Sequence, residues 1–209
     1  MTNYWGILAG IASGLFSGLA GRYVEEWLSR PRLKVDFVPS EGGFQTEAKW
    51  EKDGTEFVEI YIRARVQNRW GHVAKQCRAY LVKLEEVHSP STKATEYHDS
   101  LVLRWPAPGG GDYLPRDIPR GVNQFFDVVG VFKHSPSEWR FGFKERFSEH
   151  DELRKRRGRY RFTVLVTGDG VKPAGRKIDV IYEGRSDNLK TFNMGPFPPL
   201  RWWNILGHW

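Results

Sequence analysis

The ten residues Phe57–Val66, FVEIYIRARV, alternate regularly between two kinds of side chain. One row is entirely apolar and consists of Val58, Ile60, Ile62, Ala64 and Val66. The other row is mixed and consists of Phe57, Glu59, Tyr61, Arg63 and Arg65. A period of two is typical of a β-strand with one face on a core and the other toward solvent. The stretch therefore predicts a half-buried strand.

Short strand candidates continue on both sides of this stretch. They are Leu33–Val38, Cys77–Leu84, Leu101–Trp105, Asn123–Phe132, Trp139–Phe143, Tyr160–Thr167 and Lys177–Tyr182. Clusters of Pro, Gly and Ser separate them, including three consecutive glycines within 106–112. Residues 147–157 predict one short helix or an extended loop. About eight short strands with turns between them predict a mainly β fold, an antiparallel β-sandwich.

Composition agrees with one folded domain plus an appendage. The chain has 209 residues, of which 40% are hydrophobic and 27% charged, and this excludes a disordered chain, collagen and a polytopic membrane protein. A single cysteine excludes a disulfide framework and a multi-cysteine zinc site. The net charge of +7 favours anionic neighbours such as phospholipid or nucleic acid.

Two motifs carry a resemblance to a known family. The run Val66–Cys77, VQNRWGHVAKQC, resembles the V-x-N-x-G-x-x-x-A-x-x-(V/C) turn of CARDB-like immunoglobulin-fold modules. In that family a strand ends at the Asn, the Gly turns the chain, and the Ala begins the return. This chain departs by one residue, because Arg69 and Trp70 stand where the pattern has a single position.

The second motif is Gly158–Val164, GRYRFTV, which is similar to the G-x-Y-x-h-x-V strand of such modules. The resemblance covers residues 55–85 and 158–183 and implies an immunoglobulin-like β-sandwich without catalytic residues. The overall layout also looks like uncharacterised bacterial single-pass proteins with an N-terminal anchor and a cytoplasmic immunoglobulin-like domain.

The N-terminal segment Tyr4–Gly21 carries no charge and no proline over 18 residues. As a helix it would span about 27 Å, close to the hydrocarbon thickness of a bilayer. Aromatic residues flank it at both ends, as in an interfacial belt. The segment predicts one transmembrane α-helix. A cleaved signal peptide is the alternative, with small residues at 19–21, although no basic residue precedes the apolar run.

Charge sets the expected orientation of this helix. Arg22, Arg30, Arg32 and Lys34 all follow the apolar segment, and no Lys or Arg precedes it. The positive-inside rule then predicts the N-terminus outside and the C-terminal domain in the cytoplasm, at the bacterial inner membrane.

Small residues form two rows along the same segment. The rows contain Gly6, Gly10, Gly14 and Gly18, and beside them Ala9, Ser13 and Ser17. Bulky residues occupy most of the opposite half of the helix. A smooth face of this kind lets helix backbones approach closely in lipid. The pattern predicts a homo-oligomer; the alternatives are a face for another membrane protein, or a small pore lined by the two serines.

No pattern for catalysis or metal binding emerges. The six histidines include no pair at i+2 to i+4, so no local metal-ligand pair exists. The stretch 170–177 superficially resembles a phosphate loop, but a strand pattern rather than a helix follows it, so a turn is predicted. Cys77 is expected to be a small core residue. The sequence therefore predicts no enzyme, no cofactor and no metal.

The densest positive charge is a cluster formed by Arg154, Lys155, Arg156, Arg157 and Arg159. Three interpretations stay open: a solvated turn balanced by the acidic residues of 145–152, a site for anionic lipid headgroups, and a site for nucleic acid or a nucleotide ligand. Tyr160 shares the register of Phe162 and Val164 and is expected to face the core, which weakens the nucleic-acid interpretation.

The expected organisation has three parts: an anchor helix with its glycine zipper at 1–30, a cytoplasmic sandwich at 31–194, and a Pro/Trp-rich tail at 195–209. The tail is expected to cover a sheet edge or to enter the membrane interface. The predicted function is a membrane-anchored, non-enzymatic scaffold that holds an unknown protein partner. The alternative is a ligand-sensing effector that permeabilises the membrane in a bacterial defence or stress pathway.

Overall fold

A computed structural model describes residues 21–22, 24–88, 92–94, 100–106, 112–135, 138–142, 157–184 and 189–197. Within them it is mainly β, with a short helix at 24–29. The strands are β1 (Leu33–Asp36), β2 (Gln45–Lys52), β3 (Thr55–Asn68), β4 (Ala74–Val87), β5 (Thr92–Ala94), β6 (Leu101–Val102), β7 (Arg116–Ile118), β8 (Asn123–Ser135), β9 (Glu138–Gly142), β10 (Gly158–Asp169), β11 (Ala174–Tyr182) and β12 (Lys190–Phe197).

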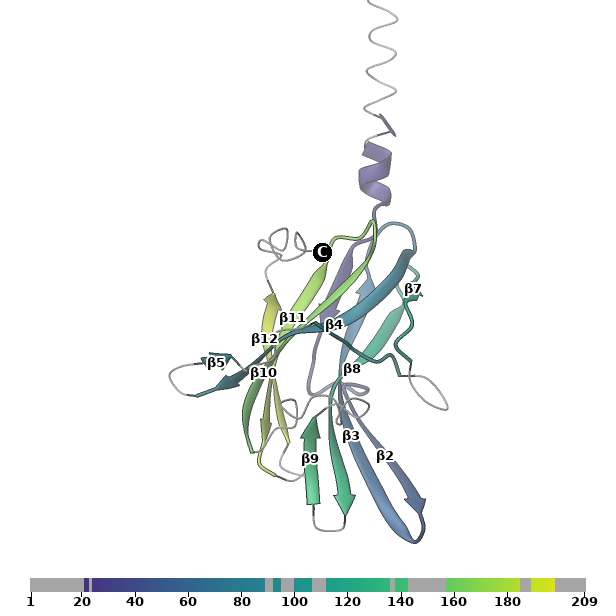
Figure 1. The fold of residues 1–209 in the computed structure, drawn as a ribbon. Helices are drawn as coiled ribbons and strands as arrows, with labels where there is room; N and C mark the ends of the chain where they lie inside the picture. Colours follow the sequence, from purple (N-terminus) through teal and green to yellow (C-terminus); the bar gives the residue numbers. More distant parts are fainter. Residues whose placement is uncertain are drawn as a thin grey trace, which may run out of the picture.

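The strands form two antiparallel sheets (Figure 1). The first has the order β1-β3-β8-β9, and β2 also pairs with β3. The second has the order β12-β11-β10-β4-β5, with β6 and β7 added along β4. Strand β3 lies at the centre of the first sheet because its apolar row needs burial and its long backbone needs partners on both sides.

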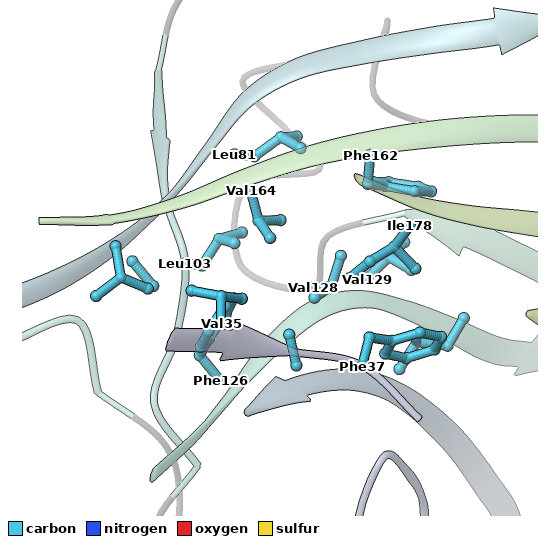
Figure 2. Close-up of a cluster of buried hydrophobic side chains, with 14 of the residues drawn as sticks. Val35, Phe37, Leu81, Leu103, Phe126, Val128, Val129, Phe162, Val164 and Ile178 are labelled. Carbon is cyan, nitrogen blue, oxygen red and sulfur yellow. The ribbon is translucent and has the colours of Figure 1, made fainter. Parts of the chain in front are cut away.

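The core lies between the two sheets (Figure 2). Leu81, Phe162, Val164 and Ile178 of the second sheet lie across from Val35, Phe37, Phe126, Val128 and Val129 of the first. The apolar row predicted for β3 is buried throughout. Tyr160 is buried in the second sheet, as its register with Phe162 predicted, and Cys77 is a core residue. The predicted β-sandwich arrangement thus agrees with the structure.

Short links join the sheets at both of their edges. On one side, the segment after β6 connects β4 to β8: Leu103 N donates to Ala79 O at 2.8 Å, and Asp127 N donates to Arg104 O at 2.8 Å. On the other side, Asn193 of β12 donates from Nδ2 to the carbonyl of Phe37 at 2.7 Å. These hydrogen bonds tie the two sheets together on both sides of the sandwich.

Two longer strands have no counterpart among those predicted. Strand β2, QTEAKWEK, is rich in polar residues and pairs with β3 through a hairpin whose turn residues, Asp53 and Gly54, have φ of 53° and 73°. Asp-Gly is a strong signal for a two-residue hairpin. Strand β12 contains Pro196 and lies at a sheet edge, where a missing N–H is tolerated. It continues three residues past the predicted boundary at 194.

The segment 170–173 is a turn between β10 and β11, as predicted in place of a phosphate loop. Among the described residues no helix is both long and apolar enough to cross a bilayer. The predicted span Tyr4–Gly21 lies outside the described residues except for Gly21, and most of 147–157 and of the tail 195–209 also lies outside them.

Candidate functional site

The helix at 24–29 leads directly into the sandwich. Arg30 Nη2 lies 2.9 Å from Glu26 Oε1, one helical turn earlier. The hydroxyl of Ser29 donates to the carbonyl of Glu26 at 2.9 Å. Only Arg30, Pro31 and Arg32 separate the helix from β1. The connection is therefore too short to act as a flexible linker.

The loop between β3 and β4, residues 69–73, holds the end of this helix. Trp70 Nε1 donates to the carbonyl of Leu28 at 2.7 Å. His72 N donates to the carbonyl of Ser29 at 2.8 Å. The last carbonyls of a helix have no partner within it and need an external donor. The loop supplies two such donors, so it caps the helix and fixes its direction.

Gly71 allows this close approach. Its φ is +79°, in the left-handed region that favours glycine. A Cβ atom at this position would overlap the carbonyl oxygens of Ser29 and Arg30. Gly71 is thus the point at which the sandwich touches the helix. Strand β3 ends at Asn68 and β4 begins at Ala74, on either side of this loop.

Two more loops lie beside the capping loop. The backbones of Arg32 and Lys172, which lies in the β10–β11 turn, form an isolated parallel β-bridge. The backbones of Asn68 and Arg120, which lies in the β7–β8 turn, form another. The Asn68 amide donates to His72 O at 2.6 Å and to Ile118 O at 3.1 Å. We call the surface made by 21–22, 24–32, 69–73, 119–122 and 170–173 the helix-proximal end. It closes the end of the sandwich from which the helix projects (Figure 1).

The helix-proximal end exposes large apolar side chains. Trp27 is 57% exposed and Trp70 is 44% exposed. The other large apolar residues exposed there are Val24, Leu28, Val73 and Val122. A shallow hollow of about 490 Å³ lies between the helix and the capping loop. Apolar exposure concentrated at one end of a domain marks an interaction surface.

The same surface is rich in positive charge. Its exposed cationic residues are Arg22, Arg30, Arg32, Arg69, Arg120 and Lys172. Its acidic residues are Glu25 and Glu26, and Glu26 pairs with Arg30. The guanidinium of Arg32 lies 4.7 Å from the ring centroid of Trp27, and that of Arg120 lies 5.1 Å from the ring of Trp70. Stacking of this kind keeps an aromatic ring and a cation together at the surface.

The described part of the predicted basic cluster, Arg157 and Arg159, lies at the other end of the sandwich. Arg154, Lys155 and Arg156 are outside the described residues, whereas Arg157 and Arg159 flank the first residue of β10. The opposite end of β10 leads into the turn beside Arg32. Twelve residues of strand separate the two ends, a distance of about 36 Å.

Arg159 forms an ion pair with Asp179 of β11. It donates to Asp179 Oδ2 from Nε at 3.1 Å and from Nη2 at 2.8 Å. Arg161 binds the same carboxylate at 2.7 and 3.0 Å. A surface hollow of about 620 Å³ is lined by Arg157, Arg159 and Tyr182. The anionic-ligand prediction for this cluster stays a prediction.

A second ion-pair network, centred on Asp127, joins β3 and β8 of the first sheet to the segment that follows β6. Its carboxylate accepts from Arg63 Nε at 2.8 Å and from Arg104 Nε at 3.0 Å. Burial opposes the charge of Arg104, but the neighbouring Asp127 carboxylate outweighs it and raises the pKa of Arg104. Burial and the hydrogen bond to Glu59 raise the pKa of Tyr61. Arg63 and Arg104 are thus paired with the Asp127 carboxylate, and the neutral hydroxyl of Tyr61 donates to Glu59.

Cys77 has the environment of an unreactive core thiol. It is fully buried, and burial, together with the charges of Asp117 and Asp169, raises the pKa of its thiol to about 11. In the part of the chain that the structure describes, no group of three or more His, Cys, Asp or Glu residues could hold a metal ion. The predicted oligomerisation residues, Gly6 to Gly18, lie outside the described part.

Sequence reasoning missed the cap formed by Trp70. The sequence around Arg69 and Trp70 did not show that the indole would reach the carbonyl of Leu28. The chain matches no protein-family model, and no curated protein matches it.

Proposed function

We propose that this protein is a membrane-anchored, non-enzymatic interaction protein that oligomerises through its N-terminal helix. The domain is proposed to be an immunoglobulin-like β-sandwich on the cytoplasmic side of the bacterial inner membrane. The anchor is the uncharged segment Tyr4–Gly21, and the oligomerisation face is the row of glycines within it. Its role is to present a sandwich domain to a partner at a fixed position relative to the bilayer.

One observation carries this proposal. The helix at 24–29 is capped by the sandwich through Trp70 and His72, with hydrogen bonds of 2.7 and 2.8 Å. A helix entering the domain from the membrane would therefore set the orientation of the domain directly. This arrangement suits a presenter of a surface better than a loosely tethered enzyme.

Crosslinking tests the oligomer. Replacing Gly10 and Gly14 with Leu adds bulk to the smooth face and is expected to reduce the full chain in detergent to monomers. Ile7→Leu with Ile11→Leu changes the opposite face conservatively and should leave the crosslinked species unchanged. An unchanged ladder of crosslinked species in the glycine variant would contradict oligomerisation through the glycine face. Extraction of the wild-type protein from membranes by alkaline carbonate would contradict the transmembrane anchor.

The capped helix also favours the second function, a ligand-sensing effector that permeabilises the membrane. A rigid junction would transmit a change in the sandwich to the helices. Ion leakage on controlled expression separates the two functions. Rapid depolarisation by the wild type but not by the Gly10/Gly14 variant supports the effector, whereas intact membranes in both support the scaffold.

A further inference from the structure

We propose that the helix-proximal end of the sandwich is itself a membrane-binding surface, which rests on the headgroups of anionic phospholipids in the bilayer that holds the anchor. The inference rests on the proposed anchor. It assigns lipid binding to a whole end of the sandwich, opposite Arg157 and Arg159, of which sequence reasoning indicated only the segment that follows the apolar span.

Chemistry identifies the occupant. Two tryptophans and four aliphatic residues are exposed beside six cationic side chains and two acidic ones. Tryptophan prefers the membrane–water interface because its ring is apolar and its N–H is polar. Cations near an anionic membrane surface each gain a favourable electrostatic contribution. A surface with both features complements headgroups and the outer part of the acyl region.

The fold brings these residues together from distant parts of the chain. Trp27 belongs to the helix, Trp70 and Arg69 to the β3–β4 loop, and Val122 and Lys172 to two further turns. The loops are joined by backbone hydrogen bonds, such as Gly121 N to Asn68 O at 2.8 Å. None of the turns 69–73, 119–122 and 170–173 contains Asp or Glu. Asp169, just before the last turn, lies opposite Lys75 in the ladder.

The position of the surface follows from the same contacts. The helix leaves the domain at this end and is capped by it, so a bilayer reached by the helix faces these loops (Figure 1). The Arg157–Arg159 region lies about 36 Å away along β10. That distance exceeds the Debye length of roughly 8 Å at physiological ionic strength, so the far cluster contributes little to this contact.

A fluorescence experiment on the full chain tests the inference. Val122→Cys places a thiol on the surface, and Glu56→Cys places one near the β2–β3 hairpin at the other end. Native Cys77 is buried and stays in place, and the wild-type chain is labelled in parallel to measure its background. Each labelled variant is reconstituted in vesicles of phosphatidylcholine with or without phosphatidylglycerol, containing a lipid with a nitroxide on its headgroup. We expect quenching at position 122 with phosphatidylglycerol and none at position 56.

Charge variants test the anionic recognition. Arg69→Gln with Lys172→Gln removes two positive charges from the surface and, at roughly 1 kcal/mol each, is expected to lower the quenched population about tenfold or more. Lys49→Gln with Lys190→Gln removes the same charge from side chains that are each 60% exposed elsewhere, and should have no effect.

Each other outcome overturns a stated part of the inference. If the chain floats with the vesicles but the label at position 122 is not quenched, the helix-proximal end does not contact the bilayer, whereas the proposed anchor stands. Equal quenching at both positions means that the domain lies flat. Quenching at position 122 that changes neither with phosphatidylglycerol content nor with the Arg69/Lys172 substitutions contradicts recognition of anionic lipid. A chain that does not float removes the anchor, and this inference with it.

Discussion

Asp179 shows how a single buried charge organises one face of the second sheet. Its carboxylate is fully buried, and its charge is compensated by four hydrogen bonds that Arg159 and Arg161 donate from the neighbouring strand. The hydrogen bond to Asp179 is the largest contribution that raises the pKa of Arg161. The two arginines remain partly exposed, at 40% and 20% of their side chains, so the cost of desolvating them is moderate.

Asp179→Asn tests this role. The variant leaves two guanidinium groups without their carboxylate and is expected to lower the free energy of unfolding by about 2–3 kcal/mol. Urea denaturation of the full chain in detergent micelles measures the loss. Glu47→Gln is the control, since Glu47 and Lys49 form an exposed pair at 2.8 Å whose loss should cost less than about 0.5 kcal/mol. Equal losses of unfolding free energy in the two variants would mean that the buried Asp179 pairs stabilise the fold no more than an exposed ion pair does.

The junction between the helix and the sandwich is decided at the scale of elements. Gly71 and Gly121 have the same φ of +79°, but they differ in their surroundings. A Cβ at Gly71 would overlap the end of the helix, whereas a Cβ at Gly121 would meet nothing within 4 Å. The pair therefore separates backbone strain from helix contact.

Gly121→Ala should cost about 1 kcal/mol, the strain of a left-handed alanine. Gly71→Ala carries the same strain and also displaces the helix end, so we expect about 2 kcal/mol more. Denaturation of both variants gives the difference, and protease cleavage near residues 28–32 should increase for Gly71→Ala alone. Equal stability and equal cleavage would show that the loop does not hold the helix.

Prediction from sequence succeeded for elements with a buried face. The alternation in Phe57–Val66 identified β3, and short apolar runs bounded by turn residues identified β10 and β11, whose central residues are buried consecutively. Strand β2 was not predicted because it is an edge strand with mostly polar side chains, although its Asp53-Gly54 turn is a signal for a β-hairpin. Strand β12 escaped because Gly195 and Pro196 suggest a turn.

The candidate surface could not be predicted in the same way. Trp27, Trp70 and Val122 are far apart in the sequence, and each alone is an ordinary exposed residue. Only the pairing of β3, β4, β8 and β10 brings their loops to one end. The sequence indicated Arg22, Arg30 and Arg32 through the positive-inside rule and Arg154 to Arg159 through their adjacency, whereas Arg69, Arg120 and Lys172 join the helix-proximal end from three other segments.

At the scale of the whole molecule, Asp36 links the two sheets. It lies on β1, and its carboxylate is 2.6 Å from Lys34 Nζ and 3.4 Å from Arg176 of β11 in the other sheet. Burial opposes the charge of Asp36, but the hydrogen bond from Lys34 and the charges of Lys34 and Arg176 outweigh it and hold its pKa below the ordinary value of 3.8.

A pH-dependent contribution to stability follows. Because the folded-state pKa is lowered, the ionised Asp36 stabilises the fold above about pH 4, and the contribution disappears as pH falls through the folded-state pKa. Asp36→Asn should therefore lose about 1 kcal/mol at pH 7 and less near pH 3. Denaturation of variant and wild type at the two pH values measures the difference. Glu51→Gln, an exposed control, should show no such dependence; a loss for Asp36→Asn that is constant with pH would contradict the linkage.

The short connection at Arg30–Arg32 has a geometric consequence for the proposed oligomer. Two helices joined by a glycine face cross at about 40°. A proposed anchor helix that continues unbroken into the capped helix at 24–29 would pass this angle on to the two domains. Over about 45 Å, from a crossing point near residue 12 to the middle of the sandwich, it would set the middles of the two domains roughly 30 Å apart in a V. Each sandwich is about 20 Å thick, because its two sheets lie about 10 Å apart and carry side chains on their outer faces. The gap between the inner faces would then be about 10 Å, wide enough for a single helix of a partner that enters from the side away from the membrane.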